Sequence, residues 1–257
     1  MPRCFDLSNR VAVVIGGTSG IGRAIARGLA EHGADVVPTG RRMEQIELIC
    51  HEVEAMGRRT LRQPVDVNDR TAIDKLRDLA LGSLGRVDIL VYAAGYTFRK
   101  PTATVEDAEW SSLIDTDVTG ALRASQSFHA PLKASGRGRI VNIASLSSYV
   151  AFQEVAAYCA AKTALVSLTR SLAMEWARDG ISVNAIAPGV FPTELNSHLI
   201  LGTPRGQEML MRTPMARFGR PEELVGAAVL LSSDAASFLT GQCIAVDGGY
   251  LAGGVNV

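Results

Sequence analysis

Apolar residues in this chain form short runs, separated by longer stretches in which apolar and polar residues recur at helical spacing. The first run is VAVVI at 11–15, and an amphipathic stretch at 21–32 follows it. This alternation predicts a series of strands and helices, and strands that are apolar at nearly every position indicate a parallel sheet covered on both faces. Further strands are expected at 35–39, 60–65, 87–93, 139–144 and 181–187.

Helices are expected between these strands, starting at Met43, after Asn68, after Thr104 and through 158–178. No spacer rich in proline or serine and no internal repeat divides the chain. The pattern therefore predicts a single α/β domain over residues 1–257, a doubly wound Rossmann fold with a seven-stranded parallel sheet and helices on both faces.

The least regular part of the chain is the segment 192–214. Gly202, Pro204 and Gly206 are expected to interrupt any helix there. In a doubly wound fold this segment would lie over the ligand crevice at the carboxyl ends of the strands. We therefore expect it to form a mobile lid over the substrate.

Charge and composition exclude several classes of function. The 26 basic and 26 acidic side chains balance, so the chain lacks the basic surplus that nucleic acids or anionic membranes attract. The first residues lack an apolar signal core, and no apolar run reaches the roughly 18 residues of a membrane span, which predicts a cytoplasmic protein. The cysteines and histidines show no metal-ligand spacing, so we expect reduced thiols and no metal at Cys4, Cys50, Cys159 and Cys243.

A glycine-rich turn follows the first predicted strand directly and begins the first predicted helix. Gly16, Gly20 and Gly22 have the spacing G-x-x-x-G-x-G. Backbone N–H groups at such a helix start can bind a pyrophosphate, although a purely structural turn would look the same in isolation. The binding interpretation places Thr18, Ser19 and Ile21 in the same contact.

A second candidate feature combines a tyrosine, a lysine and a serine. Tyr158 and Lys162 are four residues apart and so share a helix face, and Ser145 ends a predicted strand 13 residues before Tyr158. An ammonium group near a phenol favours its ionised form, so Lys162 would help Tyr158 exchange a proton near neutral pH. A Tyr–Lys pair on a solvated helix is the alternative when these two residues are taken alone.

Six features occur together in an order that resembles the short-chain dehydrogenase/reductase family, and the resemblance covers essentially the whole chain. They are GGTSGIG at 16–22, VDV at 65–67, VDILVYAAG at 87–95, Ser145, YCAAK at 158–162 and VNAIAPG at 183–189. The resemblance implies that Tyr158 is the general acid and base and that Ser145 orients the substrate oxygen. It also implies that Lys162 holds the nicotinamide ribose and favours the tyrosinate.

The same resemblance implies further contacts with a nicotinamide coenzyme. Ordinary structural roles are the alternative for some of these residues, since an aspartate can cap a helix and Pro-Gly can form a turn. The implied contacts are Asp66 and Val67 at the adenine, Ala94 and Gly95 at the adenine ribose, and Pro188, Gly189, Val190 and Thr193 at the nicotinamide end.

Three positions depart from the family pattern. Ile15 replaces a threonine and Tyr92-Ala93 replaces a pair of asparagines, and we expect both changes to be tolerated because family contacts there are largely backbone or structural. Asp117 stands where the family usually has an asparagine that completes a proton relay to the lysine. Two interpretations remain open: the Asp117 carboxylate pairs with Lys162, or it faces away and only shapes a helix bend.

The end of the second predicted strand bears on the choice of coenzyme. NAD-preferring relatives place an acidic residue there against the ribose 2′-hydroxyl, whereas this chain has Gly40 followed by Arg41 and Arg42. A guanidinium can bind a 2′-phosphate through two hydrogen bonds, which favours NADP over NAD. Two solvated arginines at the start of a helix are the alternative.

The C-terminal part of the chain bears on the substrate. The segments APGVFPTELN and RTPMARFGRPEEL resemble the sugar-acid and polyol branch of the family, especially gluconate 5-dehydrogenase-like members. A 3-oxoacyl-carrier-protein reductase is the rival enzyme, although Asp179 stands where such reductases often have arginine. A nucleotide-binding sensor without turnover is an alternative from another class. The family resemblance further implies a homotetramer and a small-molecule substrate.

Overall fold

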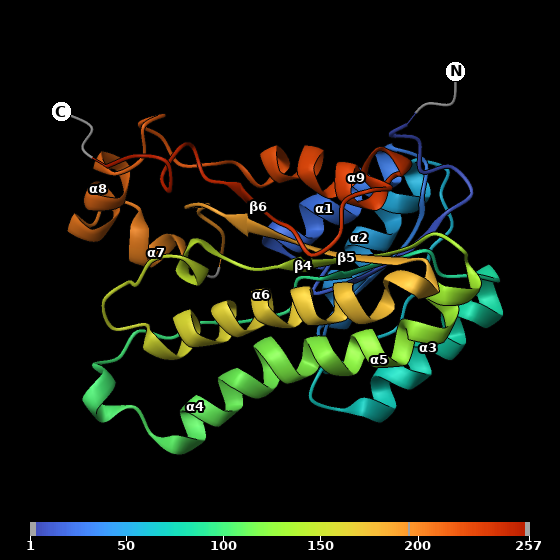
Figure 1. The fold of residues 1–257 in the computed structure, drawn as a ribbon, viewed down its shortest axis with the longest axis horizontal. Coiled ribbons are helices and arrows are strands. Elements are labelled where there is room, and N and C mark those ends of the chain that lie inside the picture. The colour runs from blue at the N-terminus through green and yellow to red at the C-terminus, as the bar shows by residue number, and fades with distance from the viewer. Residues whose placement is uncertain (1–3, 195, 255–257) are drawn as a thin grey trace.

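Parallel strands form the centre of the protein, and helices cover both faces of the sheet (Figure 1). The computed structural model describes residues 4–194 and 196–254. Its strands pair in the order β2-β1-β3-β4-β5-β6, which is the doubly wound order expected from the sequence. Their bounds are β1 (Val11–Ile15), β2 (Asp35–Thr39), β3 (Ile89–Tyr92), β4 (Gly138–Ile143), β5 (Ile181–Pro188) and β6 (Cys243–Val246).

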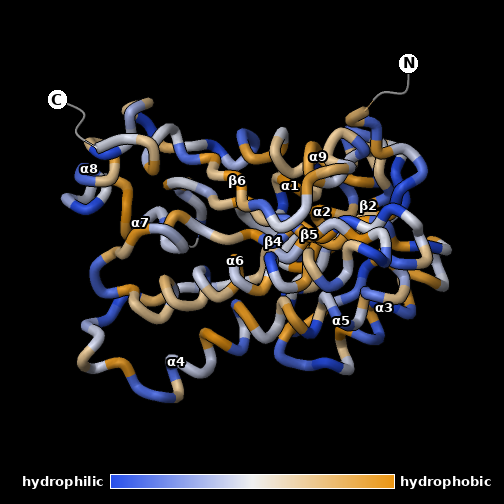
Figure 2. Tube along the Cα trace, viewed as in Figure 1, coloured by the Kyte–Doolittle hydropathy of each residue, from blue (hydrophilic) through white to orange (hydrophobic). Residues whose placement is uncertain are grey.

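The helices form two layers because neighbouring strand residues point to opposite faces. Val13 packs with one layer and Val14 with the other, and both side chains are fully buried. Figure 2 shows hydrophobic residues gathered in the middle of the molecule, around the strands. One layer contains α1 (Gly20–Glu31), α2 (Met43–Ala55) and α9 (Val225–Ser232), and the other contains α3 (Arg70–Leu84), α5 (Gly120–Ala134) and α6 (Ala156–Trp176). Shorter helices are α4 (Asp107–Ile114), α7 (Ser197–Ile200), α8 (Pro204–Met211) and the single turns Thr102–Thr104, Leu146–Ser148, Ala177–Asp179, Pro221–Leu224 and Asp234–Ala236.

The strand predicted at 60–65 is absent, so the part of the chain that the structure describes has a six-stranded sheet and the predicted number of seven is wrong. This segment runs beside the outer edge of β2, and backbone hydrogen bonds join the two at Val36 and at Val65. Pro38 lies between these contacts in β2 and has no N–H to donate. The ladder on this edge is therefore broken in its middle.

The long helix expected after Thr104 is divided by a π-helical turn over Asp115–Thr119, which lies between α4 and α5. Such a turn changes the helical hydrogen-bond pattern, and here the Thr116 carbonyl accepts a hydrogen bond from the Tyr92 hydroxyl. A side chain at Gly120 would meet the same hydroxyl, since its Cβ would lie 2.3 Å from the Tyr92 oxygen. Tyr92 thus contacts the π turn directly.

Two short helices form within 192–214, where the sequence analysis expected none. Pro204 occupies the first position of α8, where a missing N–H has no cost, and the Thr203 side chain accepts a hydrogen bond from the Gly206 N–H at 3.1 Å. Gly206 is required by packing, because a Cβ at this position would lie 1.8 Å from the Ile200 carbonyl oxygen. The residues expected to interrupt helices therefore begin one here.

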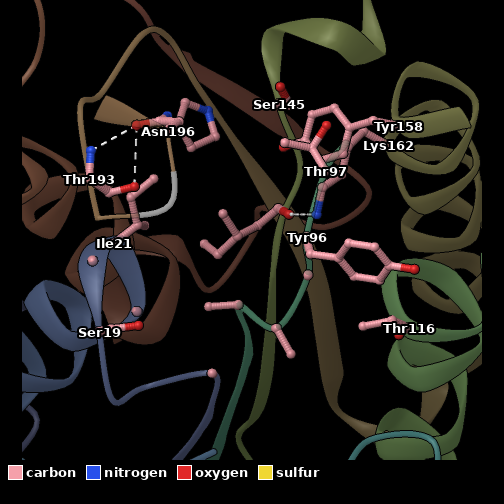
Figure 3. Close-up of a pocket in the computed structure, with 18 of the residues that line it drawn as sticks. Ser19, Ile21, Tyr96, Thr97, Thr116, Ser145, Tyr158, Lys162, Thr193 and Asn196 are labelled. Carbon is pink, nitrogen blue, oxygen red and sulfur yellow. Dashed lines mark hydrogen bonds between the residues drawn. The ribbon is translucent and has the colours of Figure 1, made fainter. Parts of the chain in front are cut away.

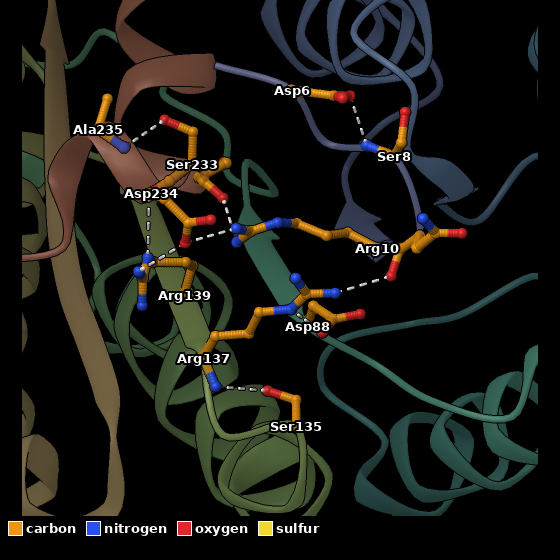
Figure 4. Close-up of polar contacts among 12 residues, drawn as sticks. Asp6, Ser8, Arg10, Asp88, Ser135, Arg137, Arg139, Ser233, Asp234 and Ala235 are labelled. Atoms are coloured by element: carbon orange, nitrogen blue, oxygen red, sulfur yellow. Dashed lines mark hydrogen bonds and ion pairs between the residues drawn. The ribbon is translucent and has the colours of Figure 1, made fainter. Parts of the chain in front are cut away.

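Charged side chains connect the first residues of neighbouring strands at the amino-terminal edge of the sheet (Figure 4). The Asp88 carboxylate is fully buried, accepts the Val11 N–H at 2.9 Å and pairs with Arg86 at 2.6 Å. Arg10, also buried, pairs with Asp234 at 2.6 Å. These contacts lie at the opposite edge from the carboxyl ends of the strands, where the candidate site is found.

Candidate active site

A cavity of about 1140 Å³ opens at the carboxyl ends of the strands. Its walls come from the glycine turn, the ends of β2 to β5, the start of α6 and the segment 188–209. Every residue that the sequence analysis assigned to catalysis or coenzyme binding lines this cavity, with the exception of Asp117. The structure therefore brings together residues from seven separate parts of the chain.

The glycine turn has a backbone that only glycine allows. Gly16 and Gly20 have φ angles of +82° and +51°, and a Cβ on Gly22 would lie 2.0 Å from the Gly16 carbonyl oxygen. Ser19 occupies the N-cap position of α1 without a capping hydrogen bond from its side chain. The first N–H groups of α1 thus face the cavity and fit the pyrophosphate of a dinucleotide coenzyme.

Two arginines line the adjacent wall, beyond β2. Arg41 and Arg42 are exposed, and neither forms an ion pair with any carboxylate of residues 4–194 or 196–254. A Cβ on Gly40 would lie 2.9 Å from the Thr18 hydroxyl oxygen, so a side chain at position 40 would require the Thr18 side chain to move. This end of the cavity carries uncompensated positive charge.

Ser145, Tyr158 and Lys162 lie together on the opposite wall (Figure 3). The Ser145 oxygen accepts a hydrogen bond from the Ser147 N–H at 3.2 Å, which leaves the hydroxyl hydrogen available to a ligand. Tyr158 lies in the first turn of α6, and the Lys162 ammonium is 5.5 Å from the centre of its ring. A hydroxyl donor and a phenol beside an ammonium can bind one carbonyl oxygen and give it a proton.

The Asp117 carboxylate points toward Lys162. The structure thus agrees with the interpretation in which the two residues pair, and not with the one in which Asp117 faces away. Asp117 Oδ2 lies 3.2 Å from Lys162 Nζ, and Asp117 Oδ1 accepts the Tyr96 N–H at 3.0 Å. A Cβ on Gly95 would lie 2.7 Å from Oδ2. The π turn thus positions a buried carboxylate behind the cavity wall, where it contacts both the lysine and the loop after β3.

Burial and charge act in opposite directions on Lys162, which is only 4% exposed. Burial lowers the pKa of Lys162, because the ammonium loses its hydration, but the nearby Asp117 carboxylate and Tyr158 oxygen raise it. The net result is that the pKa of Lys162 is raised, so the side chain is charged at neutral pH. Its ammonium also donates to the Ile143 carbonyl at 3.1 Å, which ties α6 to the end of β4.

The segment after β5 closes the cavity from the other side. Gly189 packs on the backbone of Asp247, and Thr193 donates from its N–H to the Asn196 side-chain oxygen at 2.8 Å. Thr193 also faces the glycine turn, since a Cβ on Gly20 would lie 3.3 Å from its methyl carbon. This segment therefore adjoins the glycine turn and lines the same cavity as Ser145 and Tyr158.

Comparison with known proteins gives consistent matches over nearly the whole chain. A family model described as enoyl-(acyl carrier protein) reductase matches residues 16–251. The gluconate 5-dehydrogenase of Gluconobacter oxydans is 38% identical over 96% of this chain and 97% of its own length. The NAD-dependent glycerol dehydrogenase of Listeria innocua is 37% identical over 96% and 95%.

Solved structures agree in fold and in coverage. A short-chain type dehydrogenase/reductase from Mycobacterium marinum has a TM-score of 0.92 and 34% identity, covering 96% of this chain and 97% of its own. A gluconate 5-dehydrogenase from Burkholderia cenocepacia, in complex with NADP and tartrate, has a TM-score of 0.93 and 35% identity, with 98% of both chains covered. The chain belongs to the short-chain dehydrogenase/reductase family. It is an NAD(P)-dependent oxidoreductase.

Several residues of this dehydrogenase/reductase site were not found by sequence reasoning. Ser147 lines the cavity, is 4% exposed and has a hydroxyl oxygen without a hydrogen-bond partner among the described residues. Its position two residues after Ser145 was the available signal. Arg205 on α8 was also missed, and other lining residues lie on loops without a periodic pattern and were not identifiable locally, among them Tyr96, Thr97, Phe98, Arg99, Phe152, Val155 and Asn196.

Within residues 4–194 and 196–254, no group of three or more histidine, cysteine, aspartate or glutamate side chains could hold a metal ion. Over the same ranges, none of the helices has the length and apolar character needed to cross a membrane.

Proposed function

We propose that this protein interconverts a secondary alcohol and a ketone of a sugar acid or polyol, with NADP(H) as the preferred coenzyme. The observation that carries this proposal is the wall on which Ser145, Tyr158 and the charged Lys162 meet. The gluconate 5-dehydrogenase names of the relatives support the sugar-acid class of substrate. A nicotinamide coenzyme, when bound, exchanges a hydride with the carbon that bears the substrate oxygen.

The residues of this chain supply the proton and the orientation. In ketone reduction the Ser145 hydroxyl donates to the carbonyl oxygen, and the Tyr158 hydroxyl transfers its proton to the same oxygen. Lys162 stabilises the resulting tyrosinate through its positive charge and is placed to hold the nicotinamide ribose. In alcohol oxidation the tyrosinate takes the proton back. Asp117 acts through Lys162, because it does not line the cavity.

The preference for NADP rests on the arginines beyond β2. Arg41 and Arg42 present two guanidinium groups that pair with no carboxylate of the described residues, and glycine stands at position 40, where an acidic residue would bind a 2′-hydroxyl. The Burkholderia cenocepacia relative has NADP bound, whereas the Listeria innocua relative is named NAD-dependent. The charge at this wall is the reason to favour NADP here.

An acyl-carrier-protein substrate is less well supported by the surface near the end of α6. Asp179 occupies the position where such reductases often have arginine, and its carboxylate pairs with Lys133 at 2.7 Å and contacts His129 at 2.8 Å. The pKa of Asp179 is lowered, mainly by these two hydrogen bonds. An ionised aspartate that neutralises the neighbouring lysine weakens the attraction of this surface for an acidic partner.

A lid over the cavity, a homotetrameric assembly and a cytoplasmic location complete the proposed function. The segment 192–214 would act as a lid, since Thr193, Leu199 and Met209 line the cavity that it covers. A homotetramer is supported by apolar side chains left on helix surfaces, such as Met174 on α6, which is 84% exposed. None of the four cysteines forms a disulfide within residues 4–194 and 196–254, which fits a cytoplasmic location.

Replacement of the tyrosine tests the proposed function. Tyr158→Phe removes the proton donor and keeps the ring, so we expect oxidation of D-gluconate to fall by at least about 100-fold while NADPH binding stays nearly unchanged. Turnover is followed by NADPH absorbance, and NADPH binding is measured by fluorescence titration. Substantial residual turnover in the variant would contradict the role of Tyr158, and binding without turnover in the wild type would indicate a nucleotide sensor.

A further inference from the structure

Two arginines, Arg99 and Arg205, line the cavity away from Arg41 and Arg42. They differ in whether a carboxylate of the protein pairs with them. Arg99 follows β3, and its guanidinium pairs with the Glu154 carboxylate at 2.6 Å. Arg205 lies on α8, and its guanidinium donates a hydrogen bond to the Gln153 carbonyl oxygen at 3.3 Å. Over residues 4–194 and 196–254, no carboxylate pairs with Arg205. The charge of Arg99 is thus neutralised inside the protein, whereas that of Arg205 is available to a ligand.

Arg205 does not stabilise α8 from the position that it occupies in this helix. It is the second residue of α8, where the partial positive charge of the helix dipole disfavours a cation. The helix is nevertheless placed tightly, because Gly206 packs on the Ile200 carbonyl and Thr203 caps the first turn. A cation held by a well-packed helix at an unfavourable position and facing a cavity indicates a binding role.

The contact of Arg205 locates it relative to the reacting groups. Gln153 precedes α6 by three residues, and Tyr158 lies in the first turn of α6. Asp66 and Glu194 are acidic residues that line the same cavity, and neither pairs with Arg205; Glu194 directly follows Thr193, which contacts the glycine turn. Arg205 is thus the uncompensated cation on the side of the cavity where the substrate must extend from Tyr158.

We propose that Arg205 binds the carboxylate of the substrate and so makes the enzyme select hydroxy acids over the corresponding neutral polyols. This inference rests on the proposed function and names the group that would recognise the acid. A guanidinium binds a carboxylate through two parallel hydrogen bonds, which exceed the single contact with the Gln153 carbonyl. Binding of the acid therefore replaces a weak contact by a stronger one and draws α8 over the cavity.

A matched pair of substrates tests the inference. D-gluconate and D-glucitol differ at C1, which is a carboxylate in the first and a neutral CH₂OH in the second, and both can be oxidised at C5. We expect Arg205→Gln to raise KM for D-gluconate about tenfold or more, with kcat/KM for D-glucitol changed less than about twofold. Arg212→Gln is the matched control, because Arg212 is exposed at the opposite end of the same helix and pairs with Glu208 at 3.0 Å.

The kinetic measurements decide whether Arg205 or Arg99 binds the substrate carboxylate. Equal losses for both substrates in Arg205→Gln would overturn the inference, since the residue would then act on the lid and not on the carboxylate. Selective loss of D-gluconate in Arg99→Gln but not in Arg205→Gln would also overturn it and assign the carboxylate to Arg99. An unchanged Arg212→Gln shows that a lost surface charge on this segment is not the cause.

A binding measurement separates this inference from the proposed function. L-tartrate is a hydroxy acid and threitol is its neutral counterpart, and each is added to the NADP-saturated protein in a thermal-unfolding experiment. We expect tartrate to raise Tm of the wild type and of Arg212→Gln, with the shift lost in Arg205→Gln and absent with threitol. A wild type that oxidises no sugar acid but shows this pattern would refute the proposed function alone. A tartrate shift that is the same in Arg205→Gln, or missing in the wild type, would refute the role of Arg205.

Discussion

Replacement of Asp117 by asparagine removes one charge from the buried pair behind the cavity and changes little else in shape. The Asp117 side chain is fully buried, and Lys162, its partner at 3.2 Å, is 4% exposed. Asparagine keeps an oxygen that can accept the Tyr96 N–H, so the loop after β3 retains its contact. The variant therefore isolates the effect of the negative charge on Lys162.

The expected loss of stability is large for one substitution. Removal of one partner of a buried ion pair costs about 3–5 kcal/mol, because the remaining charge is left without compensation. The retained hydrogen bond with Tyr96 places Asp117→Asn at the lower end, about 3 kcal/mol. For a chain of this length such a loss lowers Tm by roughly 6–12 °C.

The loss of stability in Asp117→Asn should depend on pH in a direction that follows from the pKa of Lys162. In the wild type the folded pKa of Lys162 is raised above the ordinary 10.5, so its stabilising contribution is full below that pH and is lost as the pH rises through the folded pKa. In Asp117→Asn, burial acts without the opposing carboxylate and lowers the folded pKa of Lys162. The difference in unfolding free energy between the two proteins should then shrink as the pH rises from 7 to 10.

Urea unfolding at several pH values measures this difference, with Asp115→Asn as the control. Asp115 lies on the same π turn but pairs with Arg123 near the surface, at 2.9 Å, and its loss should cost at most about 1 kcal/mol. The pH–rate profile of alcohol oxidation should also change in Asp117→Asn, because the Lys162 ammonium beside Tyr158 then lacks its carboxylate partner. Unchanged stability and superimposable pH–rate profiles would show that Asp117 is not coupled to Lys162.

Two other substitutions give independent checks. Arg41→Ala should weaken NADPH binding about tenfold or more and NADH binding much less, because only NADPH has the 2′-phosphate, and equal losses in fluorescence titrations would assign Arg41 another role. Ser147→Ala should leave Tm unchanged or slightly higher, because it removes a buried hydroxyl oxygen without a partner, and should raise KM for a polyhydroxylated substrate several-fold. Ser148→Ala, which loses a 2.8 Å hydrogen bond to the Lys162 carbonyl, should instead lower Tm, and a fall in Tm for Ser147→Ala would contradict this account.

Local patterns in the sequence were sufficient for the features that depend on local geometry. The glycine spacing after β1 follows from φ angles and close contacts within a few residues, as at Gly16 and Gly22. The four-residue spacing of Tyr158 and Lys162 places them on one helix face whatever the rest of the chain does. Apolar periodicity predicted the fold class for the same reason, since burial on two faces imposes it on each strand.

The sequence could not decide features that depend on residues far apart in the chain. The seventh strand is missing because Pro38 has no N–H to donate. The nitrogen of Pro38 faces the outer edge of β2, where residues 60–65 would have to pair. The direction of Asp117 depends on a π turn that contacts Tyr92, and the exposure of the Arg205 charge depends on which acidic residues happen to pack nearby. Sequence by itself determined the backbone scaffold and the catalytic residue types, because steric and periodic constraints are local. Tertiary structure alone decided which charges are paired, because electrostatic compensation depends on distance in space and not on separation along the chain.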